Sequence, residues 1–390
     1  MATLTRPLPA IARSSSSHIP WFIWCSALAV TSVTIGAHWD VSWHRSIGRD
    51  TFWTPAHLAI YLCGVLAGVA CGYLIFSTTF RSASPMRANS VRVLGFTAPL
   101  GAFLSAWGGV AMITSAPFDN WWHNAYGLDV KIVSPPHTLL VTGVSGVEIG
   151  SLFLIMAAMN RAQDDPALQR RLQLLLLYIA GLMTVLTMFF RMEYTWDIFL
   201  HNAGAYISVA IGVPLYFAAV WKASRSRWAC TWMTGIYTLF MIGMILVLPL
   251  FPAEPKLGPV FQAVTQFIPP KFPPLIIVPA ILLDLLWAKV GERNKLLVSI
   301  ASGPIFILGL VAVEWPFSSF LMTKASENRF FATGFHDYDL PSWSAEVSRH
   351  FVNPQHGLVL WRGLGMASLY AAISVWLGLL LGEWMRKIRR

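Results

Sequence analysis

Two stretches of the sequence, residues 38–57 and 118–137, place aspartate and histidine at matching positions. In each stretch an aspartate precedes a histidine by four residues, and a second histidine follows a proline-containing segment. The six residues are Asp40, His44 and His57 in the first stretch and Asp119, His123 and His137 in the second. Two imidazoles and one carboxylate form a ligand set that suits copper, zinc or iron. The pattern therefore predicts a metal site in each stretch.

The spacing within each stretch explains how the three side chains could meet. Residues four apart on a helix lie on one face, with β-carbons about 5–6 Å apart, so the aspartate and first histidine can reach one ion. The last histidine opens the next helix after a proline, and a helical hairpin would return it beside the pair. Gly48 and Gly127 would supply a tight turn. Asp50 and Asp129 are expected to orient a histidine ring through its free N–H.

A duplicated hairpin without metal is the alternative interpretation of these two stretches. In that case the histidines and aspartates only hydrogen-bond to one another. Haem ligation by paired histidines is less favoured, because these histidines cluster with acids in loops. The repetition of tryptophan, glycine and aspartate around the candidate ligands favours the metal interpretation.

The spacing of the six residues resembles that of the C subunit of the copper membrane monooxygenases, the particulate methane and ammonia monooxygenases. That family carries an Asp-x3-His-x12-His site, which the first stretch matches, and an Asn-x3-His-x13-His site, which the second matches with Asp119 in place of asparagine. The resemblance lies mainly in residues 20–160. It implies copper at one or both sites, oxidation of a small apolar molecule with O₂, and partner subunits.

The composition predicts the elements that must position these residues. The chain is 56% hydrophobic and 12% charged, whereas soluble domains carry about 25% charged residues. Apolar runs long enough to cross the roughly 30 Å hydrocarbon core as helices recur along the chain. They lie at about 20–38, 55–76, 93–116, 136–158, 172–191, 203–221, 229–251, 273–288, 296–314 and 361–385. We predict an all-α polytopic integral membrane protein with about ten transmembrane helices.

The predicted spans divide the chain into three parts. Residues 1–19 form a tail, residues 20–222 form three related helical hairpins, and residues 223–390 form four further transmembrane helices with two long outer loops. The third hairpin carries a weaker copy of the motif, with Asp197 and His201. The first six spans are thus expected to be repeated hairpins.

The net charge of +10 is explained by orientation. Most lysines and arginines fall in alternate loops, which by the positive-inside rule places both termini in the cytoplasm. Every histidine except His18 then lies on or near the extracytoplasmic face of a cytoplasmic membrane. No nucleic-acid partner is expected; the expected partners are the lipid bilayer and either other membrane subunits or a second copy of the chain.

Other ionisable residues are weaker candidates. Acids inside membrane spans usually face a bundle interior or a polar cavity, so they could form a proton path or hydrogen-bond to a neighbouring helix. These intramembrane acids are Glu148 and Asp284. The weaker metal-ligand candidates are Asp197, His201, His336, His350 and His356.

Two classes of function follow from these features. The first is a copper-dependent membrane oxidoreductase of monooxygenase type, or its metal-bearing subunit. The alternative is a metal-stabilised transporter or a non-catalytic subunit of a larger membrane complex, in which Glu148 and Asp284 would line a path. The sequence contains no Gly-rich phosphate loop and no serine nucleophile elbow, so ATP-driven or hydrolytic chemistry is not supported.

Overall fold

Helices form nearly all of the regular structure in this computed structural model, which describes residues 18–81, 84, 86–127, 134–291 and 294–389. The first four helices are α1 (Trp21–Ser46), α2 (Pro55–Phe80), α3 (Leu100–Tyr126) and α4 (Pro135–Arg161). The next four are α5 (Pro166–Phe189), α6 (Ala203–Ala210), α7 (Val213–Ser224) and α8 (Ala229–Val247). The last four are α9 (Ile277–Val290), α10 (Lys295–Leu321), α11 (Ala345–Ser348) and α12 (Gly357–Met385).

Shorter elements connect these helices. Strands β1 (Val91–Val93) and β2 (Phe96–Ala98) pair antiparallel as a hairpin between α2 and α3. The third expected span therefore begins at Leu100 and not at residue 93. The 3-10 turns are η1 (Arg87–Asn89), η2 (Met192–Tyr194), η3 (Asp197–Phe199), η4 (Leu248–Leu250) and η5 (Lys324–Ser326).

Nine helical segments of the described chain are long and apolar enough to cross a membrane. This agrees with the predicted class, an all-α integral membrane protein. The expected span at 273–288 differs: helix forms only over Ile277–Val290, which is 14 residues and about 21 Å long. The prolines up to Pro274 keep the preceding chain out of a helix, because proline has no N–H to donate.

The span expected at 203–221 is interrupted in its middle. Helix α6 ends at Ile211, and α7 begins after Gly212, whose φ is +105°. The carbonyls freed by the break are bound by side chains: Arg191 donates from Nε to the Ser208 carbonyl (2.7 Å), and Ser374 donates to the Ala210 carbonyl (2.9 Å). Such replacement partners are what permit a broken helix at membrane depth.

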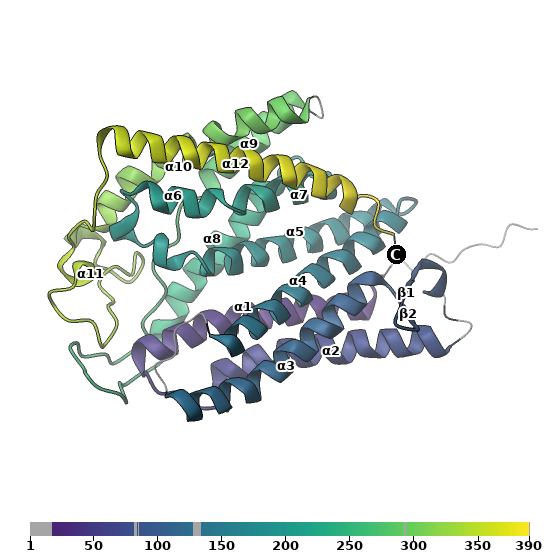
Figure 1. Cartoon of the computed structure of the whole chain (residues 1–390), viewed down its shortest axis with the longest axis horizontal. Coiled ribbons are helices and arrows are strands. Elements are labelled where there is room, and N and C mark those ends of the chain that lie inside the picture. The colour runs from purple at the N-terminus through teal and green to yellow at the C-terminus, as the bar shows by residue number, and fades with distance from the viewer. Residues whose placement is uncertain (1–17, 82–83, 85, 128–133, 292–293, 390) are drawn as a thin grey trace, which may run out of the picture.

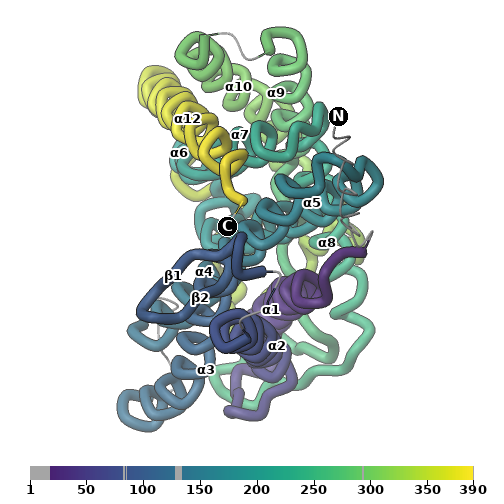
Figure 2. The backbone as a smooth tube through the Cα atoms, turned by 90° about the vertical axis from the view of Figure 1, so that its right-hand side faces the viewer, coloured from purple at the N-terminus to yellow at the C-terminus, as the bar shows by residue number. Residues whose placement is uncertain are grey.

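The long helices form one elongated bundle with two different ends. Helices α1, α2 and α3 lie on one side, α9, α10 and α12 lie on the other, and α5 and α8 lie between them (Figures 1 and 2). The loops around α11 lie at one end, and the β-hairpin and the C-terminus lie at the other (Figure 1). The first described residue, His18, lies near Arg171 at the start of α5. Asn160, at the end of α4, donates to the Ile388 carbonyl (2.7 Å). Both described ends of the chain are therefore on one side of the bundle.

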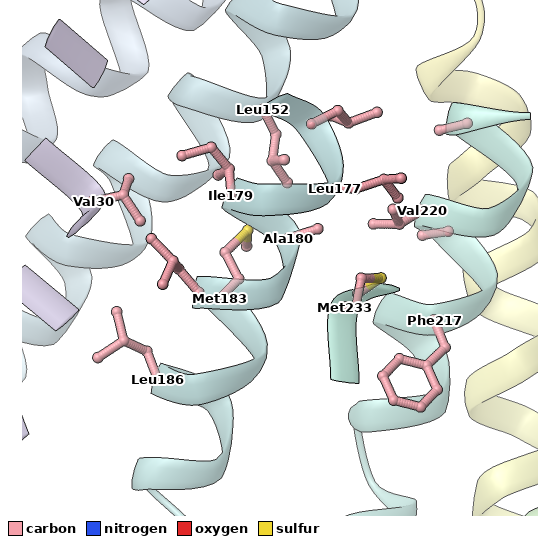
Figure 3. Packing of buried hydrophobic residues seen from close by; sticks show 14 of the residues in the cluster. Val30, Leu152, Leu177, Ile179, Ala180, Met183, Leu186, Phe217, Val220 and Met233 are labelled. Atoms are coloured by element: carbon pink, nitrogen blue, oxygen red, sulfur yellow. The ribbon is translucent and has the colours of Figure 1, made fainter. Parts of the chain in front are cut away.

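Helix α5 lies at the centre of the core. It is apolar around most of its circumference, as expected of a fully enclosed helix, and its side chains Met183 and Leu186 are buried. Figure 3 shows these residues between Val30 of α1 and Phe217 of α7. A single hydrophobic core thus joins the N-terminal hairpins to the C-terminal helices.

Helices α3 and α4 meet at backbone distance through glycines. A β-carbon added at Gly108 would lie 2.6 Å from the carbonyl oxygen of Gly143, and one added at Gly150 would lie 2.6 Å from that of Gly101. Small residues allow such close approach between membrane helices, where van der Waals packing replaces the hydrophobic effect. This contact sets the position of α4 and therefore of His137 at its start.

We predict that Gly108→Ala destabilises the protein and that Gly72→Ala does not. The new methyl group at position 108 would press on backbone, and overpacking of this kind costs about 1–3 kcal/mol. A β-carbon at Gly72 meets nothing within 4 Å. Thermal unfolding of the detergent-solubilised variants measures the difference, and equal melting temperatures would contradict the close α3–α4 contact.

Candidate metal centre

The first stretch folds as the hairpin that its spacing predicts. Asp40 and His44 lie in the last turns of α1, and His57 is the third residue of α2. The chain reverses through Gly48, whose φ of +82° favours glycine. Pro55 is the first residue of α2, a position where its missing N–H costs nothing.

Four side chains converge at the mouth of this hairpin. The Nε2 atom of His57 is 3.1 Å from Oδ1 of Asp40 and 3.3 Å from Oδ2 of Asp50. The Nε2 atom of His44 is 3.9 Å from Oδ2 of Asp40 and 3.6 Å from Oδ2 of Asp50. The side chain of Asp50 is 9% exposed and that of His44 is 44% exposed, so the group is enclosed on one side and open on the other.

The geometry of these side chains suits a cation. One ligand atom from each of Asp40, His44 and His57 lies within 4.8 Å of the other two, and no other group of three in the described chain meets this criterion. Oδ1 of Asp40 is buried and accepts no hydrogen bond. In the described residues neither Asp40 nor Asp50 has an ion pair with lysine or arginine; both face only the histidines.

The tautomer of His57 follows from its backbone contact. Its Nδ1 atom is 2.9 Å from the carbonyl oxygen of Thr51, and a carbonyl only accepts, so Nδ1 carries the hydrogen. The lone pair of a neutral His57 then lies on Nε2, facing the carboxylates of Asp40 and Asp50. Three acceptors directed at one another require a positive charge between them, which a metal ion supplies and a proton supplies only in part.

Asp50 differs from its expected role. We expected it to orient a histidine through the free ring N–H, but it faces the Nε2 atoms, on the same side as Asp40. The carbonyl of Thr51 takes the orienting position instead. The reason is the turn at Gly48, which folds the following residues back over the end of α1. Asp50 is therefore a fourth candidate ligand.

The second stretch repeats the placement but not the full convergence. Asp119 and His123 lie near the end of α3, and His137 is the third residue of α4. The Nε2 atoms of His123 and His137 lie 3.3 Å from Oδ2 and 3.4 Å from Oδ1 of Asp119 respectively. Oδ1 of Asp119 is buried without a hydrogen bond, like the same atom of Asp40. Asp129 lies outside the described residues.

The third copy holds a guanidinium group in place of a metal site. Arg349 Nη1 lies 3.4 Å from Oδ2 of Asp197. The His201 Nε2 atom is 2.9 Å from the hydroxyl of Ser319, and its ring packs against Trp315. The weaker expectation of metal ligands at Asp197 and His201 is wrong, because the carboxylate is already neutralised and the ring is enclosed by aromatic residues.

The histidines of the large outer loop do not form a metal group either. Burial and the nearby cations Lys271, Arg349 and Arg45 lower the pKa of His336 to about 3, so its surroundings repel a further cation. His350 and His356 are exposed and join no group of converging ligands in the described chain. All three weaker expectations are corrected in this way.

Asp284 has a structural role at the start of α8. Its fully buried carboxylate accepts hydrogen bonds from the backbone N–H of Cys230 (3.3 Å) and Thr231 (2.8 Å) and from the Thr231 hydroxyl (2.8 Å). It thereby caps the N–H groups that a helix start leaves free. A path lined by Asp284 is not supported by this arrangement.

Glu148 and Glu314 are the other acids buried in the bundle. Glu148 in α4 is 7% exposed, and its Oε1 is buried without a hydrogen-bond partner. Glu314 in α10 accepts from the backbone N–H of Leu275 (2.8 Å), just before α9. Sequence reasoning missed Glu314, although its place at the end of an expected span was the available signal.

Comparison with known proteins found no matching family model, no matching curated protein and no matching solved structure. The class of the protein is therefore defined by its own fold and site. It is an integral membrane protein of helical hairpins, and its first hairpin carries a group of two histidines and two aspartates at one end of the bundle.

We predict that Arg349→Met destabilises the protein without changing its metal content. The change would leave Asp197 buried and unpaired, and breaking a buried ion pair from one side costs about 3–5 kcal/mol. Unfolding in denaturant measures the loss, and the double variant Arg349→Met with Asp197→Asn should recover most of it. Loss of bound metal in a folded Arg349→Met protein would contradict the assignment of the third copy.

Proposed function

We propose that this chain is a metal-binding membrane protein in which Asp40, His44, Asp50 and His57 hold one copper ion. We further propose that it acts as a monooxygenase-like oxidoreductase on a small apolar substrate, or as its metal-bearing subunit. The observation that carries the proposal is the convergence of both imidazole Nε2 atoms on the carboxylates of Asp40 and Asp50.

The donor set fits copper. Imidazole nitrogen is a common ligand of copper, zinc and iron, and two carboxylates balance the charge of a divalent ion. Zinc and iron would accept the same four donors, so copper rests on the spacing shared with the monooxygenase C subunit. The buried Oδ1 of Asp40, which accepts no hydrogen bond, is the ligand atom most in need of such an ion.

The residues of the chain have distinct roles in this proposal. Copper, when bound, would supply redox chemistry with O₂. Asp40 and Asp50 neutralise the charge at the site, and the Thr51 carbonyl keeps the lone pair of His57 directed inward. The half-exposed ring of His44 forms the open side, through which a small molecule could approach.

We propose that Asp119, His123 and His137 form a second site of the same kind. The shared placement in the hairpin and the buried Oδ1 of Asp119 support it. Here the carboxylate lies between the two rings, so binding would require the rings to close on one ion.

We also propose that both motifs lie on the extracytoplasmic face of a cytoplasmic membrane. The motifs lie at the opposite end of the bundle from the C-terminus (Figure 1). The excess of lysine and arginine in the loops of that C-terminal end supports a cytoplasmic location for it.

We predict that His57→Ala and Asp50→Asn each weaken metal binding at the first site by more than about 100-fold. That is more than the loss usually seen when a residue behind a ligand is changed, because both would be direct ligands. Metal analysis and electron paramagnetic resonance of purified protein measure the loss, with His356→Ala as a matched control. Redox-active copper that responds to O₂ supports the enzyme, whereas unchanged metal content in both variants would refute the site.

A transporter is the second candidate, and Glu148 favours it. Its buried, unpartnered Oε1 is the kind of intramembrane group that marks a proton or ion path. The break between α6 and α7 is also a feature of many transporters.

The transporter interpretation predicts that Glu148→Gln abolishes metal-dependent flux in proteoliposomes while metal binding at the first site persists. Thr184→Val, which also changes a buried polar residue, is the control. Absence of any flux in the wild-type protein would exclude this candidate.

A further inference from the structure

A groove of about 380 Å³ lies at the end of the bundle opposite the histidines. It is formed where α4 ends, α5 begins and α7 ends, with α8 along one wall. Because these are the ends of three membrane-spanning segments, the groove lies at the depth of lipid head groups. It takes no part in the proposed metal sites.

The groove is positively charged. Arg170 of α5 and Arg225 after α7 both line it, no aspartate or glutamate does, and neither arginine has an ion pair in the described chain. The nearest acid in sequence, Asp165, is engaged with its own helix, where its Oδ1 accepts from the N–H of Leu168 (3.0 Å). Arg225 has a φ of +57°, a conformation in which glycine is usual at a helix end, so its side chain is retained at a conformational cost.

The lower wall of the groove is apolar and exposed. Leu174 and Trp232 line it and are 49% and 55% exposed. Gln173 donates to the Ser224 carbonyl (2.7 Å), which joins α5 to the end of α7 and keeps the groove's polar rim in place. The site therefore has a cationic, polar upper part and an apolar lower part that continues toward the lipid.

We propose that this groove binds one anionic phospholipid, with its phosphate between Arg170 and Arg225 and an acyl chain along Leu174 and Trp232. Basic pockets between membrane helices recognise such head groups through charge and hydrogen bonds. A free phosphate ion would use the arginines but not the apolar wall. The two-part character of the groove therefore favours the lipid.

Titration of the full-length protein in detergent with phosphatidylglycerol or phosphatidylcholine tests this assignment, with bound lipid counted by native mass spectrometry. The wild-type protein should prefer phosphatidylglycerol. Arg170→Gln with Arg225→Gln should weaken its binding about 30-fold, because each arginine near a membrane surface contributes about fivefold. The lysine double variant should retain binding.

Arg87→Gln with Arg92→Gln is the matched control, since both residues are exposed in the β-hairpin region of the chain. It should bind phosphatidylglycerol like the wild type. Equal binding of the two lipids by the wild type would overturn the proposal, as would undiminished phosphatidylglycerol binding in a folded Arg170→Gln, Arg225→Gln protein. Displacement of the lipid by millimolar inorganic phosphate would assign the groove to a free anion instead.

Discussion

A buried carboxylate must be balanced by positive charge or hydrogen bonds, and this constraint organises both ends of the bundle. Near the histidine end, Asp337 pairs with Arg45 (2.5 Å) and Glu346 pairs with Lys271 (2.6 Å). Asp40 and Asp50 differ, because within the described chain they face only imidazole nitrogen. That difference separates a candidate ligand group from the structural ion pairs around it.

The three N-terminal hairpins solve this charge problem differently. The first gathers two aspartates around two histidines, and the second places Asp119 between two rings. The third binds its aspartate with Arg349, which comes from the loop before α12. A guanidinium delivered from distant sequence thus replaces the function that we propose for metal in the first hairpin, and it also fastens the outer loop to the bundle.

The same constraint explains the irregular helices in the second half of the chain. The short α9 and the broken α6–α7 segment expose backbone groups that no lipid can satisfy. Glu314 accepts from the N–H of Leu275, Asp284 caps α8, and Arg191 binds carbonyls at the α6–α7 break. Two of these acids resemble functional intramembrane groups in sequence, yet their hydrogen bonds give them structural roles. Glu148 has no such role for its Oε1.

The sequence by itself determined the membrane class, most of the spans and the hairpin placement of the six candidate ligands, because hydropathy and helical spacing are local properties. It could not place the break at Gly212 or shorten α9, since both depend on partners from other helices. It also assigned Asp50 to the wrong side of the rings. Only the tertiary structure decided which aspartates meet histidine and which meet arginine, because that choice depends on chain segments up to about 150 residues apart, such as Asp197 and Arg349.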